Sequence, residues 1–415
     1  MKKNVVKNTT MLYLMSAAKL VLPLITIPYL SNVLSTEAYG TTVFVKSIMT
    51  TMQIVVDFAF GFSGTRAIAL ARDNKEETEK EAARIFTAQL ILALGCSAVM
   101  VGMAVFMPSL KGMEWFAVLS FIPVFLSIYL RNYFFRGLEK MEVLTYRYFI
   151  TKSISTVLTF VLIHGDADLM MVAYLDIFTS VIAAVVVTWK IKQLGYKIGL
   201  SNIKEALVKL GESTVYFVSN IATTAFGALN TMLVGIYLTK TDAAYWGNAM
   251  VLISAILALY DPITDGIYPE MMRCRDLKYL RKVLLIFMPL IIAGCIFSFY
   301  AAPAVLGIFG KEKYISAIPI FRRLIPVLLF SFPAQLLGWP GLGAISKTKQ
   351  TTASTIIAAL FQCGGLALLG ITGNFTLISL ATLRCVTEFF LMALRGGMVL
   401  YYRKDFVHAG SEEAA

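Results

Sequence analysis

Residues 1–84 are MKKNVVKNTTMLYLMSAAKLVLPLITIPYLSNVLSTEAYGTTVFVKSIMTTMQIVVDFAFGFSGTRAIALARDNKEETEKEAAR. Two long apolar runs lie in this stretch, separated and flanked by short polar segments. Three lysines precede the first run and five Lys or Arg residues lie within 66–84, whereas the segment between the runs carries only Glu37 as a charge. In proteins that cross a membrane several times, Lys and Arg gather in the cytoplasmic loops and set the orientation. The stretch therefore predicts a polytopic membrane protein whose N-terminus is cytoplasmic.

The alternation of basic and non-basic loops continues along the chain, and Arg403 and Lys404 follow the last apolar run. A membrane-spanning helix needs about 20 largely apolar residues. Twelve segments meet this need, at 9–34, 39–65, 82–107, 115–136, 143–163, 169–190, 212–238, 243–267, 283–308, 315–341, 351–372 and 376–401. The first run is too long for a signal peptide, so we expect it to be kept as a span. The sequence thus predicts an all-α protein of twelve transmembrane helices with both termini in the cytoplasm.

The composition agrees with a membrane protein. Of the 415 residues, 58% are hydrophobic and 15% are charged, whereas about 25% of a soluble domain is charged. In a soluble protein, the net charge of +12 would suggest a nucleic-acid partner. Because the basic residues are spread over the cytoplasmic loops, orientation and anionic lipids explain them, and we expect no nucleic-acid partner.

The sequence lacks the motifs of common enzymes and metal sites. It has no G-x-x-x-x-G-K-[ST] run, so we do not expect ATP hydrolysis by a P-loop. The five cysteines have neither metal-ligand nor redox spacing, which predicts no metal site and no cofactor. With no nucleophile elbow or other catalytic motif, we expect a transporter rather than an enzyme.

The longest predicted cytoplasmic loop divides the spans into two sets of six. We expect an N-terminal half at 1–205, a C-terminal half at 206–402 and a cytoplasmic tail at 403–415. Similar short stretches occur at equivalent places in the halves, such as Asp57 late in the second span and Asp261 late in the eighth. Two six-span halves of one orientation are typical of transporters built from parallel repeats.

Charged side chains within a span are costly and usually face the bundle interior or a water-filled cavity. Cations outnumber anions at these positions, which is the reverse of a pore for cations. The charged residues within the predicted spans include Lys19, Lys46, Asp57, Lys152, Asp176, Asp261, Asp265, Arg322, Arg323, Arg384, Glu388 and Arg395.

Helical spacing places some polar residues on shared faces. Lys46, Gln53 and Asp57 lie on one face of the second span. The seventh span carries an uncharged polar stripe, formed by Tyr216, Asn220, Thr223, Gly227 and Asn230. Two halves that face each other across a wet cavity would need such stripes.

Several of these charges favour a role in binding substrate. Lys19 and Lys46 have no acidic neighbour in the sequence, and neither has the pair Arg322 and Arg323. Because adjacent residues point about 100° apart around a helix, we expect only one of these two arginines to face the cavity.

Two interpretations stay open for the charges of the last span. Arg384 and Glu388 lie four residues apart, so they form either a functional pair or a structural salt bridge. Arg395 lies closer to the cytoplasmic side, where it is either functional or reaches out to the interface.

Four stretches resemble polysaccharide-repeat flippases of the Wzx type, which share a superfamily with the MATE drug exporters. PLITIPYLSNVLSTEAYG (23–40) resembles the opening of that family, and DFAFGFSGTRAIALA (57–71) resembles the segment after its second span. FRGLEKM (135–141) resembles the family's FQGLEKM, with Arg136 where Gln is usual. LLGWPGLG (336–343) resembles the end of the tenth span, although its Trp-Pro departs from the family pattern.

The resemblance implies a MATE-like fold of two six-helix halves around a cationic cavity. It implies a bacterial inner-membrane flippase that moves a polyprenyl-pyrophosphate-linked oligosaccharide outward, for O-antigen, lipopolysaccharide or capsule synthesis, beside other polysaccharide-assembly membrane proteins. The implied contacts to pyrophosphate and sugar are Lys19, Lys46, Arg322, Arg323, Arg384, Asn220 and Asn230. Because nothing in the sequence binds ATP, transport against a gradient would need a coupling ion, and from their depth in the spans alone we expect Asp57, Asp176 and Glu388 to carry a proton or sodium ion.

Three other functions are alternatives to the flippase. A MATE-type exporter of drugs or metabolites in exchange for a cation would favour acidic residues in the spans, but this chain has an excess of basic ones. A polysaccharide polymerase or ligase needs catalytic groups on a sizeable outside loop, and all predicted outside loops are short. A scaffold without transport activity leaves the charges deep in the spans unexplained.

Overall fold

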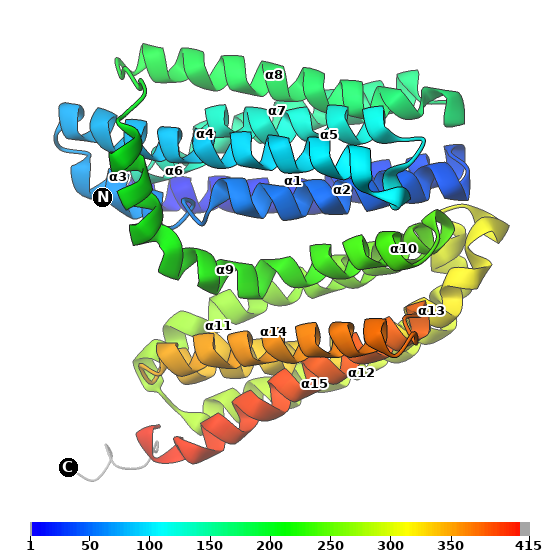
Figure 1. Cartoon of the computed structure of the whole chain (residues 1–415). Helices are drawn as coiled ribbons and strands as arrows, with labels where there is room; N and C mark the ends of the chain where they lie inside the picture. The colour runs from blue at the N-terminus through cyan, green and yellow to red at the C-terminus, as the bar shows by residue number, and fades with distance from the viewer. Residues whose placement is uncertain (1, 407–415) are drawn as a thin grey trace, which may run out of the picture. The chain divides into compact units, whose positions relative to one another are not determined.

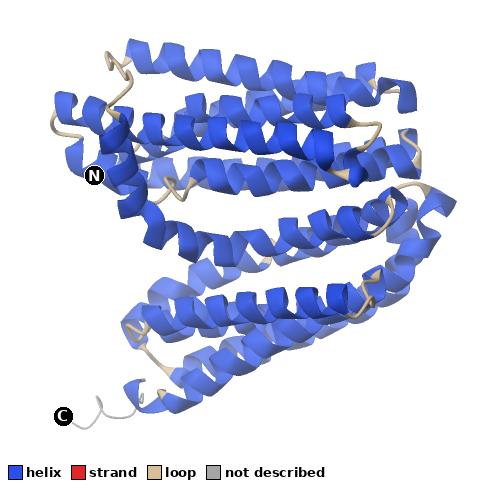
Figure 2. Cartoon of the chain, in the orientation of Figure 1, coloured by secondary structure: helices blue, strands red, loops and turns tan. Residues whose placement is uncertain are grey.

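The computed structural model describes residues 2–406, and the side chains of these residues except those of 2–9, 12, 219, 222–226 and 311. Within this range the chain consists of helices joined by short loops (Figure 2). The α-helices are α1 (Lys2–Val33), α2 (Thr36–Asp57), α3 (Ser63–Ala71), α4 (Lys75–Phe106), α5 (Glu114–Leu126), α6 (Asn132–Gly137), α7 (Met141–Leu162), α8 (Leu169–Gln193), α9 (Ile203–Tyr237), α10 (Lys240–Leu257), α11 (Tyr260–Cys274), α12 (Leu277–Gly307), α13 (Ile318–Leu336), α14 (Thr348–Ile371) and α15 (Leu377–Tyr401). The 3₁₀ helices are η1 (Pro108–Leu110), η2 (Ser127–Leu130), η3 (Asp166–Asp168), η4 (Lys311–Ala317) and η6 (Arg403–Asp405), and η5 (Leu337–Gly343) is a π-helix.

The chain is a multi-pass membrane protein with an all-α fold. In the described part of the chain, nine helical segments are long and apolar enough to cross a membrane. The helices α2, α7 and α9 occupy three more of the predicted spans and have 22, 22 and 35 residues. The sequences of α2 and α7 are more polar, and in α9 the described apolar segment is the shorter Gly227–Tyr237. The predicted count of twelve spans and the cytoplasmic termini stay predictions. Most of the predicted tail, 407–415, lies outside the described residues.

Four of the predicted spans are interrupted as helices in the structure. The second span ends as a helix at Asp57, because Phe58 and Ala59 adopt left-handed φ angles of 41° and 55°. The fourth span changes to a 3₁₀ helix after α5 and breaks at Arg131, whose φ is 42°. Left-handed backbone is sterically unfavourable for residues with a Cβ, so a regular helix cannot continue through these positions.

Equivalent interruptions occur in the eighth and tenth predicted spans. The eighth span divides into α10 and α11 at residues 258–259, and the tenth changes from α13 into the π-helix η5. The second and eighth spans are equivalent in the predicted repeat, and so are the fourth and tenth. In transporters with internal repeats, interrupted helices at corresponding positions often mark the binding region. The interruptions therefore agree with the predicted repeat, which stays a prediction.

Contacts between residues divide the chain into two compact units, 1–236 and 237–415. This division assigns α9 to the first unit, although the predicted C-terminal half begins at 206. Polar side chains near the start of α9 bond to α3 and α4, which accounts for the assignment. The contact units divide the chain at residue 236, whereas the predicted halves divide it at residue 205. The contact units therefore do not test the predicted halves, which stay a prediction.

In the first unit, α1 packs along α7, and α5 packs against α2, α4 and α8 (Figure 1). The core includes the fully buried Phe60, Phe134 and Phe135. Where α3 meets α6, a Cβ added to Gly137 would lie 2.6 Å from the Ile68 side chain. Small residues allow such close helix packing, which stabilises helix association in membranes.

In the second unit, α13 is the central helix and packs against α10, α12 and α15. Its core includes the fully buried Phe332 and Leu336. Arg395 of α15 is 8% exposed and donates hydrogen bonds to the Ala334 carbonyl oxygen at 2.6 Å and to the Ser354 Oγ at 3.0 Å. Its guanidinium also lies against Gly338, the second residue of η5. In this structure the Arg395 side chain therefore points into the second unit and makes structural contacts there. It does not reach out to the membrane interface.

Candidate functional site

Lys19 of α1 and Lys46 of α2 are the predicted phosphate contacts of the first unit that carry a charge. Of the two, Lys19 has the more basic surroundings. Its Nζ lies 5.8 Å from the centre of the Tyr148 ring, which belongs to α7. Arg136 of α6 and Arg147 of α7 are close enough to interact with it electrostatically. The packing of α1 on α7, with a 2.8 Å hydrogen bond from the Thr145 hydroxyl to the Met11 carbonyl oxygen, holds Lys19 beside Tyr148.

Asp57, predicted as an ion carrier, is the acidic group of the same neighbourhood. It is the last residue of α2, and its Oδ1 accepts a 2.9 Å hydrogen bond from the Gln53 amide. Gln53 also donates to the Ser127 hydroxyl at 2.9 Å, at the point where α5 gives way to a 3₁₀ helix. Arg136 is the basic residue that interacts electrostatically with Asp57. Gln53 and Asp57 thus share one face of α2, as predicted. Their hydrogen bonds lie where α2 ends and where α5 changes into a 3₁₀ helix.

We call Lys19, Asp57, Arg136 and Arg147 the Lys19 cluster. It brings three cations together with one carboxylate. Within the described part of the chain, none of the four forms an ion pair within 4 Å. The Arg136 Nε is buried without a hydrogen-bond partner there. Lys19 and Asp57 are exposed, and Arg136 and Arg147 are half-buried. Several cations without a close counter-ion favour the binding of an anion through Coulomb attraction.

Sequence reasoning missed Arg136 and Arg147. Both lie near the cytoplasmic ends of predicted spans, where basic residues are common and were attributed to orientation. One signal was available, because Arg136 departs from the glutamine that is usual at this place in the resembled family. A glutamine there would carry no charge, so the departure adds a cation to this chain.

Lys46 and Asp176 form an ion pair with each other and are not part of the Lys19 cluster. The Lys46 Nζ is 3.8 Å from the Asp176 Oδ2, which joins α2 to α8. The side chains are 52% and 30% exposed, so this ion pair is open rather than buried. The prediction assigned Lys46 to the substrate and Asp176 to a coupling ion, and the structure places the two opposite charges in contact.

The predicted polar stripe of α9 is only partly open. Asn230 is 1% exposed, whereas Asn220 is half-buried and Tyr216 is 37% exposed. The side chain of Thr223 lies outside the described residues. Contact between Asn230 and a substrate would therefore require α9 to move.

Among the predicted residues of the second unit, Arg322 and Arg323 point to different neighbours, as their spacing predicts. The Arg322 Nε donates to the Phe299 carbonyl oxygen of α12 at 3.0 Å, and the guanidinium lies 4.6 Å from the Phe299 ring centre. The Arg323 Nε donates to the Thr382 hydroxyl of α15 at 2.9 Å. Neither arginine makes an ion pair among the described residues.

Arg384 and Glu388 form a salt bridge within α15. The Arg384 Nη2 and the Glu388 Oε1 are 2.5 Å apart, and the side chains are 16% and 10% exposed. Of the two interpretations left open by the sequence, the structural bridge has direct geometric support. Both residues are then neutralised by each other in this conformation.

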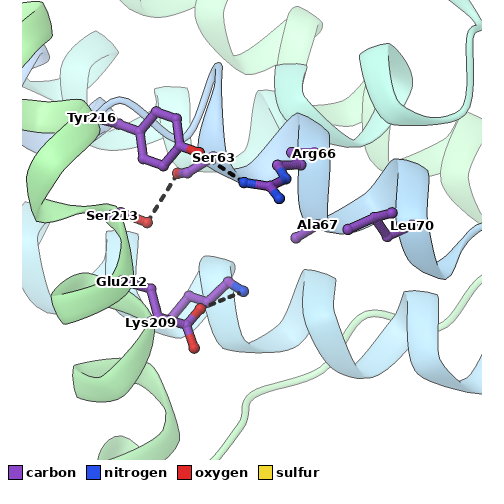
Figure 3. A pocket seen from close by; sticks show the side chains of 8 residues that line it. All are labelled: Ser63, Arg66, Ala67, Leu70, Lys209, Glu212, Ser213 and Tyr216. Carbon is purple, nitrogen blue, oxygen red and sulfur yellow. Dashed lines mark hydrogen bonds and ion pairs between the residues drawn. The ribbon is translucent and has the colours of Figure 1, made fainter. Parts of the chain in front are cut away.

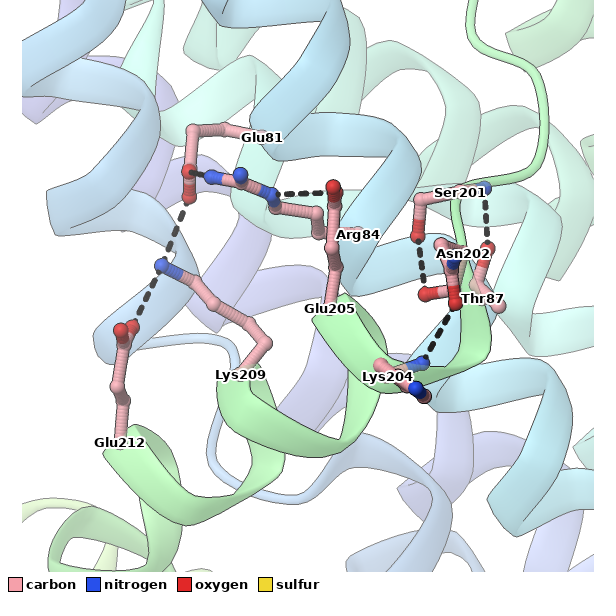
Figure 4. Close-up of polar contacts among 9 residues, drawn as sticks. All are labelled: Glu81, Arg84, Thr87, Ser201, Asn202, Lys204, Glu205, Lys209 and Glu212. Carbon is pink, nitrogen blue, oxygen red and sulfur yellow. Dashed lines mark hydrogen bonds and ion pairs between the residues drawn. The ribbon is translucent and has the colours of Figure 1, made fainter.

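A network of five charged residues joins α4 to the start of α9 (Figure 4). Glu81 is bonded to Arg84 at 2.6 Å and to Lys209 at 2.7 Å. Arg84 also bonds to Glu205 at 3.0 Å, and Lys209 bonds to Glu212 at 3.0 Å. Burial opposes the charge of Lys209, but its hydrogen bonds to the two carboxylates outweigh this effect and raise its pKa. The network neutralises its own cations, so it acts as a structural clamp and not as an anion site.

Residues 5–275 match the family described as polysaccharide biosynthesis protein. The chain belongs to this family. The match covers the Lys19 cluster and the Lys46–Asp176 pair, and it ends before Arg322 and Arg384. It confirms the family resemblance predicted from the sequence, whose residues lie mainly in the same range.

Two relatives of this family member carry the name "Putative O-antigen transporter". The protein from Shigella dysenteriae is 25% identical, over 79% of this chain and 92% of the relative. The protein from Escherichia coli (strain K12) is 23% identical, over 80% of each chain. A solved structure, an inward-facing multidrug resistance MATE family transporter of the MOP superfamily, has a TM-score of 0.70 at 14% identity, over 92% of this chain and 95% of that chain. The family member therefore has the MATE fold that its sequence predicts.

Proposed function

We propose that the chain moves a polyprenyl-pyrophosphate-linked oligosaccharide from the cytoplasmic to the outer leaflet of the bacterial inner membrane. Membership of the polysaccharide biosynthesis family, the names of the two O-antigen transporter relatives and the transporter fold support this function. The observation that carries the proposal is the Lys19 cluster, in which three cations meet a single carboxylate.

The chemistry of the cluster suits a pyrophosphate. A pyrophosphate diester carries about two negative charges, which are costly to bring into a region of low dielectric. Arg136 and Arg147 present planar guanidinium groups that bind phosphate oxygens in pairs, and Lys19 adds a point charge. Net positive charge in the cluster can therefore compensate the ligand. The polyprenyl tail can stay in the bilayer, because only the polar head needs a protein environment.

Transport against a gradient needs an energy source, and we propose a proton or sodium ion. Of the three predicted carriers, Asp176 lies in an ion pair with Lys46 and Glu388 in one with Arg384. Asp57 instead accepts its hydrogen bond from the neutral Gln53. Asp57 is therefore the strongest candidate, because it can take up a cation without first leaving a salt bridge.

The alternative function is a MATE-type exporter of drugs or metabolites in exchange for a cation. The shared fold supports it no less than the flippase, because different functions occur on one fold. The charge of the Lys19 cluster argues against it, since a cationic drug would be repelled by three basic side chains. A site for cationic drugs would need acidic or aromatic groups without an excess of basic side chains.

The experiment measures the sidedness of the lipid-linked oligosaccharide in membrane vesicles of a deletion strain that carries plasmid-borne variants. A membrane-impermeant sugar-modifying reagent and mass spectrometry separate the outer pool from the inner pool. We expect Lys19→Gln, Arg136→Gln and Arg147→Gln each to shift the oligosaccharide to the cytoplasmic face, by at least tenfold if each loses a charged phosphate contact of about 1.5–3 kcal/mol.

The matched control is Arg72→Gln, which removes the same charge from an exposed residue paired with Glu139 at 2.6 Å. It should transport like the wild type when its membrane level is equal. If deletion leaves the outer pool unchanged and alters only sensitivity to toxic cations, the flippase is refuted and the exporter takes its place.

A further inference from the structure

A cavity of about 220 Å³ lies between α3 and the first turns of α9 (Figure 3). Both helices belong to the first unit, on the side that the charge pattern predicts to be cytoplasmic. The lining residues are Ser63, Arg66, Ala67, Leu70, Lys209, Glu212, Ser213 and Tyr216. The function proposed above uses none of them.

Arg66 supplies the uncompensated charge of this cavity. Its Nη1 donates to the Tyr216 hydroxyl at 3.1 Å, and it forms no ion pair among the described residues. A guanidinium has five N–H donors and no acceptor, so several donors remain for a ligand. The other cation of the lining, Lys209, is already held by Glu81 and Glu212 at 2.7 and 3.0 Å.

Hydroxyl groups surround the Arg66 guanidinium. Ser63 and Ser213 share a 2.9 Å hydrogen bond between their Oγ atoms, which ties α3 to α9. The Tyr216 oxygen accepts from Arg66, so its own hydrogen is available to an acceptor. Figure 3 shows Tyr216, Ser63 and the Arg66 guanidinium close together at one end of the cavity. One guanidinium beside hydroxyl donors is the chemistry that binds phosphate oxygens.

Apolar side chains stand beside the same donors. Leu70, a lining residue, is 77% exposed, and Phe62, next to Ser63, is 62% exposed. A soluble phosphate would gain nothing from these groups. A membrane lipid would place its phosphate on Arg66 and its acyl chains along apolar surface, and basic pockets at the cytoplasmic side of membrane helices bind anionic headgroups in this way.

We propose that this cavity binds the headgroup phosphate of an anionic glycerophospholipid from the cytoplasmic leaflet. Because the ligand bridges Arg66 of α3 and Tyr216 of α9, it stabilises the contact of these helices. The proposal does not rest on the flippase function, since it concerns a resident lipid and not the transported one.

The test is native mass spectrometry of the full chain in detergent, titrated with phosphatidylglycerol. We expect Arg66→Gln to weaken the tightest lipid-binding step about tenfold, as the loss of a charged hydrogen bond implies. Tyr216→Phe should weaken it less, because it removes one neutral donor. The matched control is Arg72→Gln on the same segment, which removes an equal charge from a residue already paired with Glu139 and should bind like the wild type.

Further titrations separate the possible phosphate sources. Phosphatidylcholine should bind more weakly than phosphatidylglycerol, and millimolar inorganic phosphate should not displace the lipid. If Arg66→Gln and Arg72→Gln bind phosphatidylglycerol equally, the site is refuted. Arg66-dependent binding of inorganic phosphate, or of polyprenyl pyrophosphate in preference to phosphatidylglycerol, would also overturn the proposal, because the ligand would then be a soluble anion or the transported lipid.

Discussion

Glu81 at the start of α4 is predicted to be the residue that holds α9 in place. Its side chain is 12% exposed and bonds to Arg84 at 2.6 Å and to Lys209 at 2.7 Å. Glu81→Gln keeps the shape but removes the charge that both cations share. A hydrogen bond to a charged group contributes about 1.5–3 kcal/mol, and each cation keeps one outer acid, Glu205 or Glu212. We therefore expect a loss of about 2 kcal/mol, below the 3–5 kcal/mol typical of a fully orphaned buried charge.

The assay is unfolding of the purified full chain in detergent, followed by tryptophan fluorescence, together with hydrogen exchange of peptides from α9. Glu81→Gln should unfold at a lower temperature, and the first turns of α9 should exchange faster. Glu76→Gln is the matched control, because Glu76 lies five residues earlier on the same helix, is exposed and forms no ion pair among the described residues. Equal unfolding and equal exchange of the two variants would refute the clamp.

A double-mutant cycle with Lys209→Met isolates the pair itself. Because Glu81 and Lys209 are in contact, the double variant should lose less stability than the sum of the single variants, by about 1 kcal/mol. Additive losses would mean that the 2.7 Å contact does not contribute to stability.

Three further predictions use the same unfolding measurement. Arg395→Gln should cost about 3 kcal/mol, because it breaks the bonds of a buried guanidinium, including the 3.0 Å bond to Ser354; a loss below 0.5 kcal/mol would contradict this. Gly235→Ala should cost about 1–3 kcal/mol, since its Cβ would collide with the Phe44 ring, and an unchanged midpoint would show that the ring can move. The contribution of Lys209 should be present below pH 10.5 and lost as the pH rises through its raised pKa, so the midpoint difference from Lys209→Met should shrink between pH 9 and pH 12.

The fold class could be predicted because hydropathy and charge act over whole segments. An apolar run of 20 residues leaves its backbone few choices in a bilayer other than a helix, and basic loops report which side they face. The interruptions could not be predicted in this way, because hydropathy averages over them. Phe58, Ala59 and Arg131 adopt left-handed backbone without being glycines. Only packing against neighbouring helices can impose such conformations, and that packing is not visible in one sequence.

The candidate site was predictable only as far as one helix extends. Residues on the same helix, such as Arg384 and Glu388, could be paired from their spacing. Partners on different helices could not, so the contact of Lys46 with Asp176 joins two residues that were assigned separate roles. A charge in one span can be recognised as unusual, but whether it is neutralised depends on a helix more than a hundred residues away.

This limit also explains why the most basic part of the site was missed. Lys19 stood out because it lies deep in a span, whereas Arg136 and Arg147 lie near the cytoplasmic ends, where an arginine usually needs no explanation. Packing of α1 along α7 brings these three together, and their combined charge exceeds what Asp57 can neutralise. An arginine at a span end is therefore informative when its side chain lies near another cation of the bundle, as Arg136 and Arg147 lie near Lys19. The buried Nε of Arg136 makes Arg136→Gln the sharpest single substitution for the transport assay.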